Sequence, residues 1–253
     1  MIQRILRRPI LLVLLQLSIY PVAAAQYSGK AGWAHKATLS MPVNGVVSQI
    51  KVSPGARVAQ GELMLSLDQR YFDTGLASAK AALSRLAPGR DEARRELDRA
   101  EELFERTVLS QVELDRARMD FAEKSAMYQE AEAAYQRARL DKEYSELKAP
   151  FALVVIRVLV VPGQTVVNQL QATPMLEVAA ADQLLISFDA KTDDASSLRL
   201  GGLVQVGDES RHAKAKVVAL NPVPGKNSVQ VQLVLDRKSM PGLRVGENVK
   251  VQW

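Results

Sequence analysis

The chain of 253 residues contains 47% apolar and 24% charged residues, a composition typical of folded domains with real cores. It has no cysteine, which excludes disulfides, thiolate metal sites, thiol catalysis and a lipid-modified N-terminal cysteine. The formal net charge is +5, but three arginines lie in the first eight residues. Without them 30 basic residues face 28 acidic ones, a net +2, so nucleic acid is not an expected partner.

The first 25 residues follow the plan of a secretory signal. Arg4, Arg7 and Arg8 precede the apolar run 10–19, and small residues follow up to Ala25. This run is about half of the roughly 20 residues that a membrane-spanning helix needs, which favours cleavage after Ala25. The sequence therefore predicts an exported protein, with an uncleaved N-terminal anchor as the alternative.

An internal repeat dominates the remaining sequence. Residues 41–58 align without a gap over residues 149–166, at an offset of 108 and with seven identities in 18 positions. Each copy contains a Pro-Gly dipeptide that favours a tight turn between two short strands, and an apolar strand follows. Because a four-strand ribbon alone has a poor core, we expect the two copies to face each other in one unit.

The segment between the copies, residues 71–144, is rich in strong helix formers. Apolar residues recur there every seven positions along two successive stretches. They are Leu76, Leu83, Leu97 and Phe104 with Ala79, Leu86, Ala93 and Ala100, and then Leu114, Phe121, Tyr128 and Tyr135 with Ala117, Ala131 and Ala138. Such seams on adjacent helices predict an antiparallel coiled-coil hairpin with arms of about 50 Å.

The turn of this hairpin has a sequence signature of its own. Ser110 and Glu113 form a capping-box pattern, and Leu109 and Leu114 occupy the positions of a hydrophobic staple. The second helix is therefore expected to begin just after Ser110.

A helix breaker interrupts the first arm of the hairpin. Pro88 removes a helix hydrogen bond, Gly89 loosens the same turn, and Arg90 falls on the apolar seam. We expect a kink or a break at this position.

The sequence after residue 178 is rich in strand-like segments again. Segments with partial alternation of apolar and polar residues, separated by Gly, Pro and Asn, lie at 184–190, 212–220, 228–236 and 248–253. A short helix is expected at 193–200, before a Gly-Gly pair. This pattern predicts a small antiparallel barrel.

Motifs of catalysis and cofactor binding do not occur in the sequence. His35 and His212 are far apart, and neither has a companion at a metal-ligand spacing. There is no nucleophile elbow, Gly-rich phosphate loop or zinc-protease helix. We therefore expect no catalytic residue, no metal and no cofactor.

The split repeat, the inserted hairpin, the return segment 147–151 and the segment 243–246 together resemble one family. This family is the periplasmic adaptors, or membrane fusion proteins, of tripartite efflux pumps and type I secretion systems. The resemblance implies a non-enzymatic protein of the periplasm, peripheral to the inner membrane. It also implies three partners: a TolC-type outer-membrane channel, an inner-membrane transporter of the RND or ABC type, and sister subunits in a ring that is hexameric in this family.

The expected fold is α+β. A lipoyl-like β-domain made of two half-motifs is interrupted by an antiparallel helical coiled-coil hairpin and followed by a small antiparallel β-barrel. The expected divisions are a signal peptide at 1–25, a strand or linker joining the barrel region at 26–40, the first half-motif at 41–68, the hairpin at 69–146 with its tip near 106–111, the second half-motif at 147–180 and the barrel at 181–253.

The resemblance also implies a binding site at the hairpin tip. TolC-binding adaptors carry Arg, then Leu four residues on, then Ser seven beyond, and Arg99, Leu103 and Ser110 match this spacing. Ser110 is equally well explained as a helix cap, and Arg99 as a solvated surface residue. Many adaptors continue past the barrel into a membrane-proximal domain, so a sequence that stops at Trp253 predicts a compact member.

Two other functions agree with parts of the sequence. A lipoyl or biotin carrier would explain the half-motifs, but it needs a lysine at a tight hairpin, and Asp68, Gln69 and Arg70 stand at that place. A structural coiled-coil scaffold would explain the hairpin but neither the split repeat nor the barrel.

Overall fold

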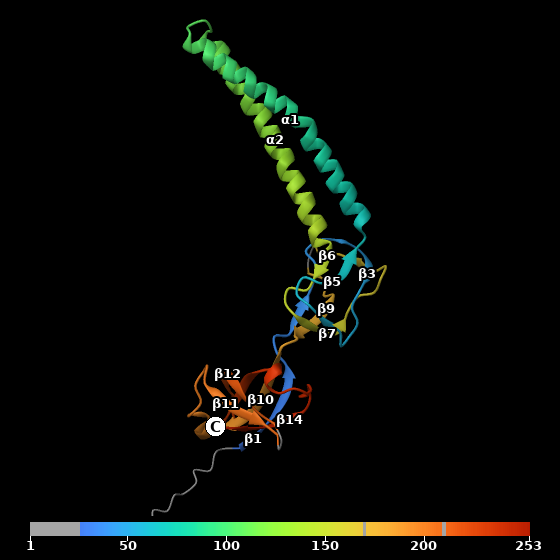
Figure 1. Cartoon of the computed structure of the whole chain (residues 1–253), viewed down its shortest axis with the longest axis vertical. Helices are drawn as coiled ribbons and strands as arrows, with labels where there is room; N and C mark the ends of the chain where they lie inside the picture. The colour runs from blue at the N-terminus through green and yellow to red at the C-terminus, as the bar shows by residue number, and fades with distance from the viewer. Residues whose placement is uncertain (1–25, 169–170, 209–210) are drawn as a thin grey trace, which may run out of the picture.

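A computed structural model describes residues 26–168, 171–208 and 211–253 of the chain. Figure 1 shows three bodies in a row: a long helical hairpin, a β-module and a barrel. The expected signal segment, residues 1–25, lies outside the described residues. Across the part of the chain that the structure describes, no helix combines the length and apolarity needed to cross a membrane.

The β-module contains the two repeat copies. Its eight strands form two four-stranded sheets, and equivalent strands of the two copies take the same places in them. The first sheet is β2 (Ala37–Leu39), β9 (Leu176–Ala180), β7 (Leu153–Val158) and β4 (Arg57–Val58), and the second is β6 (Glu146–Lys148), β5 (Leu63–Leu67), β3 (Gly45–Ile50) and β8 (Thr165–Val166). The strands β7 and β8 begin 108 residues after β3 and β4, as the sequence offset predicts.

Each copy of the repeat completes the sheet of the other copy. Strand β3 pairs with β8, with Val46 opposite Thr165, and β4 pairs with β7. The turn glycines Gly55 and Gly163 both have φ +86°, and each N–H donates to the other copy, to Val155 O and Val47 O at 2.8 Å. The prediction that the two copies form one unit is therefore confirmed.

The hairpin consists of α1 (Gln69–Glu105) and α2 (Gln111–Tyr144), which pack antiparallel as predicted. The seam is tightest near the tip, where Ala93, Leu97 and Leu114 are buried, and the basal seam residues are only half-buried. Phe104 is an exception to the predicted seam, because its side chain is 36% exposed. Helix α1 ends one residue later, and α2 begins only at Gln111 after the tip turn.

Of the two alternatives expected at Pro88, a kink or a break, the break is wrong. Helix α1 runs through this residue without interruption, and Figure 1 shows it as one ribbon that curves alongside α2. Pro88 and Gly89 are both exposed, so water can satisfy the carbonyl that loses its partner. The guanidinium of Arg90 lies 3.9 Å from the centre of the Tyr128 ring, which places this charge on the seam as a cation–π contact.

The root of the hairpin is fixed by a buried hydroxyl. Ser145 follows α2 and is fully buried, and the Gln69 amide donates to its Oγ at 2.8 Å. The same amide donates to Leu67 O at 3.0 Å, and Leu67 N donates to Ser145 O at 2.9 Å. Both ends of the hairpin are therefore held together where they join β5 and β6.

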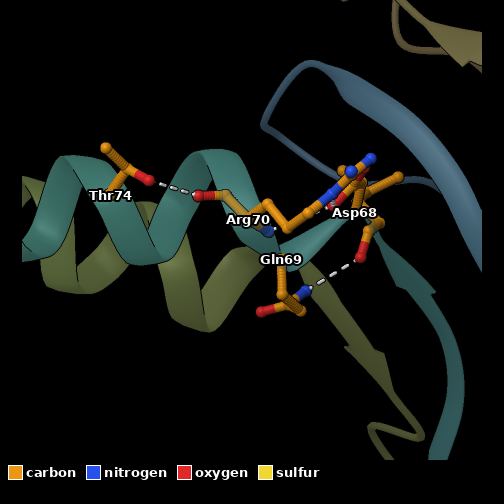
Figure 2. Close-up of polar contacts among 5 residues, drawn as sticks. Asp68, Gln69, Arg70 and Thr74 are labelled. Atoms are coloured by element: carbon orange, nitrogen blue, oxygen red, sulfur yellow. Dashed lines mark hydrogen bonds and ion pairs between the residues drawn. The ribbon is translucent and has the colours of Figure 1, made fainter.

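The first turn of α1 is capped at the same place. Figure 2 shows Asp68 beside Arg70, and the hydroxyl of Thr74 directed back to the carbonyl of Arg70. The carboxylate of Asp68 accepts from the backbone N–H of Arg70 at 3.1 Å. Hydrogen bonds from Arg70, first from its side chain and then from its backbone, lower the pKa of Asp68 to about 2.

The barrel is closed and has six strands. Their order is β1 (Gln26–Trp33), β10 (Gln183–Lys191), β13 (Ser228–Asp236), β12 (His212–Pro222), β11 (Leu203–Gly207) and β14 (Asn248–Gln252). Its core is apolar, and at one end the rings of Tyr27 and Trp253 stack at 5.2 Å. Chain segments from both ends of the described region thus belong to one barrel.

Two details of the barrel differ from the expectation. Strand β11 was not predicted, although its first four residues alternate in burial. The helix expected at 193–200 is reduced to α3 (Thr192–Ala195), because the hydroxyls of Ser196 and Ser197 donate to the carbonyls of Asp193 and Asp194. A single turn, η1 (Arg237–Ser239), follows β13.

Replacing the buried root hydroxyl should loosen the hairpin. Ser145→Ala is expected to lower the free energy of unfolding by about 1–3 kcal/mol, because the Gln69 amide loses a buried partner. Urea unfolding followed by circular dichroism measures this change. Thr74→Ala is the matched control, since it removes an exposed helix hydroxyl and should stay within about 0.5 kcal/mol of the parent. Equal effects of the two substitutions would contradict the assigned role of Ser145.

Candidate docking site at the hairpin tip

The tip turn begins with a Schellman motif at the end of α1. The N–H of Thr107 donates to Phe104 O at 2.9 Å, and the N–H of Val108 donates to Leu103 O at 3.0 Å. Thr107 has φ +57°, the left-handed conformation that this motif requires and that glycine usually supplies. The chain is therefore reversed by a short, hydrogen-bonded turn.

The second helix begins with the predicted capping box. Ser110 Oγ accepts from Glu113 N at 3.3 Å, and Glu113 Oε2 accepts from Ser110 N at 3.1 Å and from its hydroxyl at 2.7 Å. Hydrogen bonds from the Ser110 side chain, and then from its backbone, lower the pKa of Glu113 below its usual range. The Glu113 carboxylate is thus held ionised at the positive end of α2.

The predicted staple anchors this turn to the seam. Leu114 is buried in a cluster with Leu97 and Ala100, and Leu109 packs against that cluster from the turn. The guanidinium of Arg94 lies 5.4 Å from the centre of the Phe121 ring beside it. The tip is therefore an ordered platform.

The structure places the three expected site residues around this platform, and the side chains of two of them have hydrogen-bond partners. Arg99 is exposed on α1, and its Nη1 donates to Glu96 Oε1 at 2.7 Å. Leu103 is half-buried one turn further on, and the Ser110 hydroxyl belongs to the capping box. Arg99 and Leu103 can thus meet a partner protein, whereas the contacts of Ser110 are those of a cap.

The sequence interpretation missed the most exposed apolar side chains of the tip. Val108 in the turn is 72% exposed and Val112 in the first turn of α2 is 78% exposed, and Phe104 lies near them in sequence. The sequence does contain a signal for them, because these two valines flank the capping serine and do not fall on the seam. Together with Leu103 they give the tip an apolar character.

The flank of α1 below the tip is charged but internally balanced. Arg94 pairs with Asp98 at 2.8 Å, and Arg106 pairs with Glu102 at 2.6 Å, each one helical turn apart. These exposed pairs contribute little to stability. Burial against another protein would therefore gain the most free energy at the apolar tip and less along this charged flank.

Metal-ligating side chains do not gather in the described part of the chain. There, no group of three or more His, Asp or Glu side chains could hold a metal ion. His35 lies between β1 and β2, and His212 lies on β12 in the barrel.

Comparison with known proteins agrees with this geometry. A family model described as the α-helical hairpin domain of RND membrane fusion proteins matches residues 74–145. The macrolide export protein MacA of Yersinia pestis is 24% identical over 216 residues, which are 79% of this chain and 58% of MacA. The chain is a homologue of the membrane fusion proteins.

Further members of the membrane fusion protein group match parts of the chain. The multidrug resistance protein MdtA of Photorhabdus laumondii is 30% identical over 119 residues, which are 47% of this chain and 30% of MdtA. These homologues are adaptors of efflux systems. The chain spans little more than half the length of MacA and about a third of MdtA.

Solved structures of membrane fusion proteins share the fold. A MacA–MexA chimera that carries the Pseudomonas aeruginosa MexA hairpin has a TM-score of 0.65 and 19% identity, covering 90% of this chain and 80% of the chimera. The membrane fusion protein Spr0693 of Streptococcus pneumoniae R6 has a TM-score of 0.66 and 14% identity, covering 90% of this chain and 97% of Spr0693. At these identities the likeness concerns the fold alone.

Proposed function

We propose that this chain is a non-enzymatic periplasmic adaptor subunit of a bacterial tripartite efflux or export system. It links an inner-membrane transporter, of the RND or ABC type, to a TolC-type outer-membrane channel. The observation that carries the proposal is the apolar, ordered tip at the end of a long hairpin that stands on a β-module. The domain divisions expected from the sequence, including an export signal at 1–25, are part of this proposal.

The tip provides two kinds of contact for the helices of a channel. Val108, Val112 and the half-buried Leu103 supply apolar surface, which gains free energy when a partner removes it from water. Arg99 supplies a guanidinium that can exchange its weak, exposed pair with Glu96 for a carbonyl or carboxylate of the channel. Ser110 acts as a positioning residue, because its capping box fixes where Val112 stands.

The outward face of α2 supports assembly into a ring of sister subunits. Opposite the seam, a second heptad line consists of exposed small or apolar residues: Val112, Met119, Ala126, Ala133 and Leu140. Met119 is 67% exposed and Leu140 is 42% exposed, so the line is covered by no part of the described chain. A heptad line of this kind fits packing against another helix, and a ring of six is implied by the family resemblance.

The carrier alternative is weakened by the junction between β5 and α1. A carrier needs a modified lysine at a tight turn, but the residue after β5 is Asp68, which caps a 37-residue helix. A scaffold made only of the hairpin would need neither the split repeat nor the barrel. Both alternatives therefore leave parts of the structure without a role.

Charge reversal at the tip should weaken the contact with the channel. In a pull-down with a TolC-type channel, Arg99→Asp combined with Leu103→Asp is expected to reduce binding at least about tenfold, which corresponds to about 1.4 kcal/mol. Val108→Asp combined with Val112→Asp should have a similar effect without touching the seam. Export should fall in parallel.

The matched control lies near the middle of the first helix of the same hairpin. Ser84→Asp combined with Arg85→Asp changes the charge by the same amount as the first tip variant, on exposed residues of α1. It should bind as the parent does, and circular dichroism should show unchanged helix content in all variants. Normal channel binding by both tip variants would refute the docking proposal.

Self-association has a separate test on the outward line of α2. Met119→Asp combined with Leu140→Asp is expected to shift the protein from oligomer to monomer in sedimentation velocity, because two exposed apolar contacts are lost. The Ser84→Asp, Arg85→Asp variant again serves as the control. Sedimentation that is the same for parent and variant would show that this line is not the subunit contact.

A further inference from the structure

The barrel and the β-module meet at a narrow neck, visible in Figure 1, where the chain crosses twice. One crossing is 34–36, between β1 and β2, and the other is 181–182, between β9 and β10. The two crossings are tied by a hydrogen bond from Ala180 N to Ala34 O at 3.2 Å. Few bonds therefore fix the angle between the two bodies.

A cavity of about 410 Å³ lies beside this neck and is lined from both bodies. Arg57 on β4 contributes from the β-module, Asp182 from the crossing, and Arg237 and Lys238 from η1 of the barrel. We call it the hinge cleft. Its volume falls in the range of small-ligand sites.

The hinge cleft has a surplus of positive charge. Three basic side chains face one acidic side chain, and within the described residues none of the three basic groups forms an ion pair. Other arginines of the β-structure behave differently, since Arg157 donates to Glu177 and Arg211 to Asp208, each at 2.8 Å. Unpaired cations that converge from two bodies attract an anion and hold it most strongly where water is partly excluded.

Arg237 supplies the second, independent observation. Its backbone N–H donates to Asp182 O at 2.8 Å, which ties η1 to the crossing. Its side-chain Nη1 is shielded from solvent and, among the described residues, has no hydrogen-bond partner, while the residue itself lines the hinge cleft. An enclosed donor on a charged group is costly unless it is satisfied, and an oxyanion is the acceptor that matches a guanidinium best.

We propose that the hinge cleft binds a phosphate-type oxyanion, which bridges Arg57 of the β-module to Arg237 and Lys238 of the barrel. The bound anion fixes the angle between the two bodies, and its loss frees the neck. The oxyanion can be a small soluble phosphate or the headgroup phosphate of an anionic lipid. This inference does not depend on the channel-docking proposal, because it concerns the opposite end of the β-module.

Binding is tested with inorganic phosphate on the full chain. Isothermal titration against sodium chloride of equal ionic strength should show saturable binding that Arg57→Gln and Arg237→Gln each weaken at least about tenfold. Arg57 and Lys238 are exposed, so Arg57→Gln and Lys238→Gln keep the test valid if Arg237→Gln fails to fold. Lys226→Gln is the control, because Lys226 lies in the β12–β13 turn at the far end of the barrel.

Fixing of the neck is tested by a distance measurement. The chain has no cysteine, so Lys51→Cys in the β-module, between β3 and β4, and Lys214→Cys on β12 of the barrel give one label on each of the two bodies. Phosphate should narrow the distribution of label distances in the parent and leave it unchanged in the Arg57→Gln background. An unchanged distribution in the parent would overturn the bridging role.

The source of the oxyanion is separated by vesicle binding. Flotation with phosphatidylglycerol vesicles that depends on Arg57 and Arg237 would identify a lipid headgroup, with phosphatidylcholine vesicles as the comparison. Phosphate binding without vesicle binding would identify a soluble anion. Affinities for phosphate that are equal in parent, Arg57→Gln and Lys226→Gln would overturn the proposal.

Discussion

The exchange of strands between the two repeat copies is the constraint on which the rest of this structure depends. Each Pro-Gly turn donates its glycine N–H to the other copy, so neither copy has a complete sheet alone. The insertion between the copies must then leave and return at neighbouring points. Strand β5 ends where β6 begins, with Ser66 opposite Glu146, and two helices that start from these points have to run side by side.

The same constraint explains how the hairpin can carry a function at its far end. Its root is held by Ser145, Gln69 and the β5–β6 pairing, and its tip by the capping box and the staple. Between them the seam is buried only toward the tip, where docking would need the most rigid platform. The β-module thus sets the direction in which the hairpin projects, and the tip carries the side chains that a partner would contact.

Much of this arrangement can be predicted from the sequence because it depends on local chemistry. A gapless repeat predicts strands with matching bounds, glycine after proline predicts the left-handed turn, and Ser110 with Glu113 predicts the start of α2. Heptad spacing predicts the seam up to Ala100. At Phe104 the same spacing misleads, because periodicity does not show where the partner helix begins.

The remaining features depend on contacts between segments far apart in the sequence. Pro88 lies on an exposed turn of α1, where water can satisfy the carbonyl that loses its partner, and propensity alone does not reveal this exposure. Strand β11 is short, and its place depends on the closure of the barrel by β14. The hinge cleft joins Arg57 to Arg237 across 180 residues of sequence, and no local pattern brings these cations together.

The most direct test of the central claim is a disulfide between the two copies. Val46 and Thr165 are opposite each other in the β3–β8 pair, and the chain has no other cysteine that could interfere. The account predicts that Val46→Cys with Thr165→Cys forms an intramolecular disulfide, so that a chain cleaved by protease at the hairpin tip stays linked under denaturing, non-reducing conditions. Lys51→Cys with Thr165→Cys, displaced by about 16 Å along the strand, should stay unlinked. Separation of the two fragments in the first variant would contradict the account.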